Sequence, residues 1–98
     1  MEQKKKVKFR KEASESIAKI ANYIVDKGYP KTSKKFTDKL YEFGHSLNIF
    51  PDKYPLCRNA KLAKRNLRCA VFKDYAFIYK VVHRNLVIYN VIHGKRMR

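Results

Sequence analysis

The 98-residue sequence has few acidic residues, few glycines and prolines, and no long hydrophobic run. Only 8 Asp and Glu accompany 24 Lys and Arg, so the formal net charge is +16. Three Gly and three Pro, with 45% hydrophobic residues, exclude a fibrous or disordered chain. No apolar stretch is long enough to cross a bilayer, and none follows the basic start as in a signal peptide. We therefore expect a single cytoplasmic domain over residues 1–98, with a polyanionic partner and no membrane contact.

Cysteine and glycine motifs of the common enzyme classes are also missing. Cys57 and Cys69, the two cysteines, could form at most one disulfide, and reduced thiols are expected in a cytoplasm. The two cysteines are twelve residues apart, and His83 and His93 are ten apart, so no short chelating pair predicts a metal site. Neither a phosphate-cradling glycine loop nor a nucleophile elbow is present. We expect no cofactor and no small-molecule substrate.

Hydrophobic spacing predicts one strand followed by two helices. Val7 and Phe9 alternate with basic residues, which indicates an exposed edge strand. Apolar residues then recur at spacings of three and four over residues 12–27 and again from Pro30 to Phe50, with a stop at Pro51. These two stripes predict an antiparallel helical hairpin.

The second half of the sequence predicts a loop and a three-stranded meander. No periodicity holds over residues 51–65, and runs rich in β-branched and aromatic residues follow at 67–72, 76–82 and 86–92. The predicted fold is α+β in the order β-α-α-β-β-β. The helical hairpin packs on one face of a small, mostly antiparallel twisted sheet and leaves the other face for function.

Several short segments, in this order, resemble the RelE/ParE superfamily of bacterial type II toxin–antitoxin systems. They are Pro30 at the second helix, Phe50-Pro51 and Tyr54-Pro55 in the loop, Asn66-Leu67-Arg68, Tyr75-x-x-x-Tyr79-Lys80-Val81 and Val91-Ile92-His93-Gly94-Lys95-Arg96. The resemblance implies a growth-inhibiting toxin that is neutralised by an acidic antitoxin. RelE-like members cut mRNA on the ribosome, whereas ParE-like members block DNA gyrase without chemistry of their own.

The catalytic pattern of the RelE-like members is incomplete. Ala76 stands at the position where their Tyr-Arg-x-x-Tyr pattern has its phosphate-binding arginine. If the chain were RelE-like, its catalytic residues would be Arg68, His93 and Arg96, with His93 as the acid–base group because an imidazole titrates near neutral pH. The departure at Ala76 favours a ParE-like toxin that binds its target, with the mRNA endonuclease as the alternative.

Basic residues of the C-terminal half form the predicted binding surface. From residue 53 to residue 98 the chain has twelve Lys or Arg and one acid, Asp74. The surface for nucleic acid or antitoxin comprises Arg58, Lys61, Lys64, Arg65, Arg68, Lys95, Arg96 and Arg98. The basic residues of segment 4–11 either protect a sheet edge or bind a partner, and at least two of Tyr75, Tyr79 and Tyr89 are expected in the core. A nontoxic basic module that binds nucleic acid or protein remains a third hypothesis.

Overall fold

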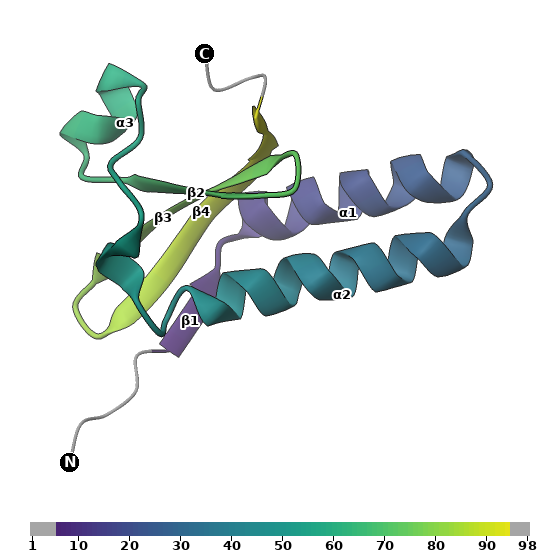
Figure 1. Cartoon of the computed structure of the whole chain (residues 1–98), viewed down its shortest axis with the longest axis horizontal. Coiled ribbons are helices and arrows are strands. Elements are labelled where there is room, and N and C mark those ends of the chain that lie inside the picture. The colour runs from purple at the N-terminus through teal and green to yellow at the C-terminus, as the bar shows by residue number, and fades with distance from the viewer. Residues whose placement is uncertain (1–5, 95–98) are drawn as a thin grey trace.

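The computed structural model describes residues 6–94, and Figure 1 shows their arrangement. The elements are β1 (Lys6–Phe9), α1 (Lys11–Asp26), α2 (Pro30–Ser46), the 3₁₀ turn η1 (Pro51–Lys53), α3 (Ala60–Lys64), β2 (Arg68–Phe72), β3 (Tyr75–Val82) and β4 (Asn85–His93). The predicted α+β class, the order of the main elements and the helical hairpin are confirmed.

The sheet has the strand order β1-β4-β3-β2. β1 runs parallel to β4, and the other neighbours are antiparallel, so β1 is an edge strand as its alternating charges predict. The β3–β4 register shifts between Ile78 and Tyr79: Ile78 pairs with Asn90, whereas Tyr79 pairs with Ile88. Tyr89 is therefore the extra residue of a β-bulge.

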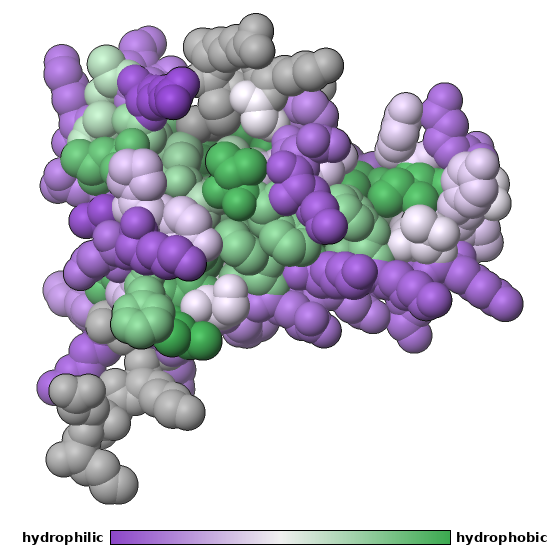
Figure 2. All heavy atoms as spheres, in the orientation of Figure 1, coloured by the Kyte–Doolittle hydropathy of each residue, from purple (hydrophilic) through white to green (hydrophobic). Residues whose placement is uncertain are grey.

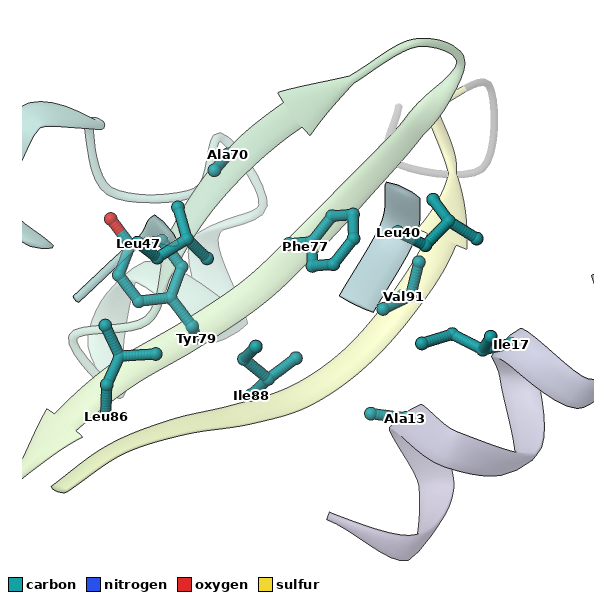
Figure 3. Close-up of a cluster of buried hydrophobic side chains, with 10 residues drawn as sticks. All are labelled: Ala13, Ile17, Leu40, Leu47, Ala70, Phe77, Tyr79, Leu86, Ile88 and Val91. Atoms are coloured by element: carbon teal, nitrogen blue, oxygen red, sulfur yellow. The ribbon is translucent and has the colours of Figure 1, made fainter. Parts of the chain in front are cut away.

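One face of the sheet and the helical hairpin enclose the main core, shown in Figure 3. Its members are Ala13 and Ile17 of α1, Leu40 of α2, Leu47, Ala70 of β2, Phe77 and Tyr79 of β3, and Leu86, Ile88 and Val91 of β4. All are at most 2% exposed. Alternate strand residues thus point at the helices, because successive side chains of a strand alternate between its faces.

Two small residues of α2 set how closely it packs. Ser33 is buried, and its hydroxyl donates a 2.8 Å hydrogen bond to the carbonyl of Ala21, which links α2 to α1. A side chain at Gly44 would place its Cβ 2.5 Å from Cζ of Phe9 and 2.9 Å from Cδ1 of Ile88. The absence of a side chain at Gly44 therefore lets α2 approach β1 and β4.

The predicted second helix is too long at its C-terminal end. α2 ends at Ser46, and Leu47 donates to Gly44 in a tighter i→i−3 turn. The Ser46 hydroxyl also donates to the Phe43 carbonyl at 2.6 Å, and this bond competes with the helical pattern. Phe50 is consequently 69% exposed, so its assignment to the apolar face of the helix was wrong.

The segment 51–65 is more ordered than the predicted loop. It contains η1 and α3, and the side chain of Asn59 caps α3 by accepting from the amides of Lys61 and Leu62. A capped five-residue helix has too few turns to produce an apolar period, which explains why the spacing analysis missed it.

The two cysteines form a disulfide, which corrects the expectation of reduced thiols. Leu56 pairs with Arg68 in an isolated antiparallel bridge, and the Cys57 amide donates to the Leu67 carbonyl at 2.9 Å. This pairing brings the Cα atoms of Cys57 and Cys69 to 4.9 Å, within the usual range for a disulfide. Cys69 is half-buried and packs against the buried side chains of Leu67 and Ile78.

Candidate binding surfaces on the open sheet face

The sheet face opposite the hairpin is only partly open. A second buried cluster lies there, formed by Cys57, Leu67 and Ile78, with Leu62 of α3 and Tyr89 of β4 packed against it. In Figure 1, α3 lies on the side of the sheet away from the hairpin. The expectation that this whole face is free is therefore wrong. Apolar side chains of α3 and its loop pack on this face and cover part of it. Within residues 6–94, one exposed region lies beside β2 and another extends over β1, β4 and β3.

The first region is an apolar groove beside β2, which we call the β2 groove. Its volume is about 780 Å³, and its lining includes Tyr54, Leu56, Arg58, Val71, Ala76 and Gly94. Val71 and Leu56 are 63% and 44% exposed, so two large apolar side chains of this groove are accessible to a partner. Figure 2 shows hydrophobic side chains gathered over the middle of the molecule, with hydrophilic ones along the outer margin of α2.

The edge of β2 beside this groove is also open. β2 is the last strand of the sheet, and the isolated Leu56–Arg68 bridge covers only its first residues. Within residues 6–94, no strand pairs with the outer edge of Ala70–Phe72. Such an edge can accept an extended peptide from a partner.

The predicted basic residues are distributed around the groove and α3. Arg58 lines the β2 groove, and Lys61 and Lys64 are exposed on α3. Gly94, just before the predicted C-terminal cations, lines the same groove as Arg58, so the loop and the C-terminal strand do meet there. Lys95, Arg96 and Arg98 lie outside the described residues.

Arg68 points to the helix-covered face. It pairs in register with Tyr79, whose side chain belongs to the main core. Its guanidinium donates to the Tyr54 carbonyl at 2.5 Å and lies 3.6 Å from the carboxylate of Asp52. Arg68 therefore ties η1 and the loop that follows it to β2, and it is not on the same face as the β2 groove.

His93 lies at the opposite end of the sheet. It pairs with Tyr75 in register, and the two rings meet edge to face with centroids 5.4 Å apart. Arg68 is on β2 and His93 is on β4, the two strands that flank β3. Their partners on β3 are four residues apart. Strand spacing places their backbones roughly 16 Å apart. The described structure thus does not bring Arg68 and His93 into one site.

Tyr79 and Tyr75 of β3 stay protonated at neutral pH. Burial raises the pKa of Tyr79 to about 12, and its hydroxyl donates to the Pro51 carbonyl at 2.5 Å. Burial, with a smaller contribution from Asp74, also raises the pKa of Tyr75. Of the three tyrosines, Tyr79 is a buried core residue, whereas Tyr75 and Tyr89 are partly buried against the two clusters, so the prediction of at least two core tyrosines was wrong. A raised pKa also means that neither Tyr75 nor Tyr79 is ionised near neutral pH, as a proton acceptor would have to be.

The second exposed region, which we call the β1 basic surface, includes basic residues of segment 4–11, for which the sequence left edge protection and partner binding both open. The sequence alone does not join these residues to Arg65, Lys80 and Tyr89. The β1 basic surface consists of Lys6, Lys8, Arg10, Arg65, Lys80 and Tyr89. Register pairing places Lys8 beside Val87 and Val87 beside Lys80, all on the face away from the hairpin. The guanidinium carbons of Arg10 and Arg65 lie 5.0 and 5.6 Å from the centre of the Tyr89 ring. The alternation of cations in β1 was the available signal, but only the sheet order adds Lys80 and Tyr89.

The described part of the chain has neither a metal-binding cluster nor a membrane-spanning helix. Within residues 6–94, no three His, Cys, Asp or Glu side chains gather into a group that could hold a metal ion. In the same range, each helix is too short or too polar to serve as a membrane span.

Comparison with known proteins gives the family. A chain described as "Chromosomal ParDE TA system from P. aeruginosa" has a similar fold, with a TM-score of 0.78 and 13% identity, over 92% of this chain and 96% of that chain. No curated protein sequence matches. Residues 7–98 match the family described as "ParE toxin of type II toxin-antitoxin system, parDE". The chain therefore belongs to the ParE toxin family of type II toxin–antitoxin systems.

Proposed function

We propose that this toxin arrests growth in the bacterial cytoplasm by binding DNA gyrase and that it performs no catalysis. The ParE family match over residues 7–98 is the observation that carries the proposal. The separation of Arg68 and His93, with Ala76 at the phosphate-binding position, supports it. Cleavage of RNA without a metal needs a proton acceptor and cations around one phosphate.

We also propose that an acidic antitoxin covers the β2 groove. The toxin's charge of +16 attracts a partner of opposite charge. The groove offers exposed Val71 and Leu56 for apolar side chains and Arg58 for a carboxylate. The open edge of β2 can pair with an extended segment of the antitoxin.

The gyrase proposal is tested by DNA supercoiling with purified gyrase and the full chain. We expect supercoiling to be inhibited at toxin concentrations comparable to that of gyrase, because the toxin binds and does not turn over. The matched control is the same toxin mixed beforehand with its antitoxin, which should restore supercoiling. Growth arrest in cells without inhibition of supercoiling would refute gyrase as the target.

The antitoxin surface is tested by Val71→Glu, which puts a negative charge in the groove at an exposed position. We expect antitoxin affinity to fall at least tenfold, since the carboxylate repels the acidic partner and is desolvated on binding. Thr32→Glu is the matched control because it makes the same change of charge, one negative charge added, at an exposed position near the start of α2. Equal losses for both variants would contradict a groove-specific contact and indicate attraction to net charge alone.

A further inference from the structure

The β1 basic surface has a geometry that neither the gyrase proposal nor the antitoxin proposal uses. Lys6 and Lys8 project from alternate positions of an exposed edge strand, and Arg10 continues the row. Alternate residues of a strand are about 6.7 Å apart, so the three cations span about 13 Å. On the β3 side of β4, Lys80 extends the surface across the sheet.

Tyr89 lies within this surface, and two guanidinium groups approach its ring. The β-bulge places Tyr89 against the second cluster, while Arg10 approaches its ring from the β1 side and Arg65 from α3. The ammonium of Lys80 donates to the Arg65 carbonyl at 3.0 Å, which fixes the end of α3 over the sheet. Flat guanidinium and aromatic groups are therefore held in place beside a row of cations.

The charge of the surface is unbalanced. Within residues 6–94, its one ion pair joins Arg10 to Glu12 at 3.8 Å, and both side chains are about half exposed. Asn85 and Val87, the register partners of Lys6 and Lys8 on β4, carry no charge. Five cations in one region repel one another, so binding of an anion would relieve that repulsion.

We propose that the β1 basic surface binds single-stranded nucleic acid. A nucleic acid backbone carries a charge at every nucleotide, which suits evenly spaced cations, and its unstacked bases can stack on aromatic rings and guanidinium planes. An acidic peptide would pair with the cations, but it has no bases that could stack on the Arg10–Tyr89–Arg65 arrangement. A duplex keeps its bases stacked and inaccessible to that arrangement.

The test is fluorescence anisotropy of the full chain with a labelled single-stranded oligonucleotide over a series of salt concentrations. The variant Lys6→Gln/Lys8→Gln removes two contacts with phosphates of the nucleic acid. Each such contact contributes about 0.7 to the slope of log K against log salt for a single strand, so the slope should become shallower by about 1.4. The control Lys34→Gln/Lys35→Gln removes the same charge from exposed positions of α2 and should leave the slope unchanged. Tyr89→Leu keeps apolar cover and should weaken binding about fivefold or more without changing the slope.

Three results would overturn the proposal. Equal slope changes for the two lysine pairs would show attraction to net charge alone. Tighter binding of duplex than of single strand, with the same dependence on Lys6 and Lys8, would show that bases do not stack on Tyr89. Displacement of the oligonucleotide by polyglutamate at equal charge concentration would assign the surface to an acidic protein. None of these results bears on gyrase inhibition, which is measured separately.

Discussion

Replacing Tyr79 by phenylalanine should change how stability depends on pH as well as its magnitude. The hydroxyl of Tyr79 donates to the Pro51 carbonyl, and the ring is fully buried in the main core. Phenylalanine preserves the packing and removes the hydrogen bond. Near pH 8 the variant should lose about 1 kcal/mol of unfolding free energy, the net value of one such bond.

The alkaline range gives a second, opposite effect. Burial raises the pKa of Tyr79 from 10.0 to about 12 in the folded protein, so the folded state holds its proton longer than the unfolded state does. The stability of the wild type that depends on this proton is complete below pH 10 and is lost as the pH rises toward 12. The full shift corresponds to at most about 2.7 kcal/mol. Because the hydroxyl reaches the exposed η1 turn, solvent screening reduces this loss to about 1–2 kcal/mol.

The variant carries no such proton, so the two stabilities should converge and then cross as the pH rises. Urea unfolding followed by far-ultraviolet circular dichroism, at intervals from pH 8 to pH 12, measures the difference. Titration of the many lysines affects both proteins equally and cancels in that difference. A difference that stays constant over this range would refute the assignment of a buried, hydrogen-bonded hydroxyl at Tyr79.

Three further changes test the packing of the fold. Gly44→Ala should destabilise the protein by about 1–2 kcal/mol in urea unfolding, because overpacking against Phe9 exceeds the gain in helix propensity. An unchanged unfolding midpoint would contradict the close approach of α2 to β1. Ser33→Ala should cost about 1 kcal/mol by the same measurement through loss of the bond to α1, whereas a neutral result would show that the bond contributes nothing. Replacing Cys57 and Cys69 together by alanine should lower the free energy of unfolding by about 3 kcal/mol, as expected for a disulfide that closes a loop of this length. Equal unfolding midpoints of the wild type with and without dithiothreitol would exclude a stabilising disulfide.

The fold was predictable because its main elements have strong periodic signals. The stripes of α1 and α2 and the β-branched runs of β2, β3 and β4 each specify one buried face, and the core in Figure 3 is built from them. The failures are local. α3 is too short to show a period, and the disulfide depends on an isolated bridge between Leu56 and Arg68 that no local pattern encodes.

The site was less predictable because strand register decides which face a residue occupies. Arg68 was grouped with Arg58 and Lys61 by proximity in sequence, but its pairing with Tyr79 turns it to the helix-covered face. Lys80 is distant from Lys8 in sequence and joins it only because β4 lies between β1 and β3. The sequence therefore shows that the protein is basic, but which cations lie together on the surface can be known only from the order of the strands in the sheet.

The claim that this toxin binds its target and does not cut RNA is tested most directly by mapping new mRNA 5′ ends during growth arrest. The full chain is induced alone in bacteria, and 5′ ends are compared across translated genes before and after arrest. The account predicts arrest without new codon-phased ends. Codon-phased cuts that disappear in His93→Ala, in a variant that still folds, would contradict it and establish a ribosome-dependent endonuclease.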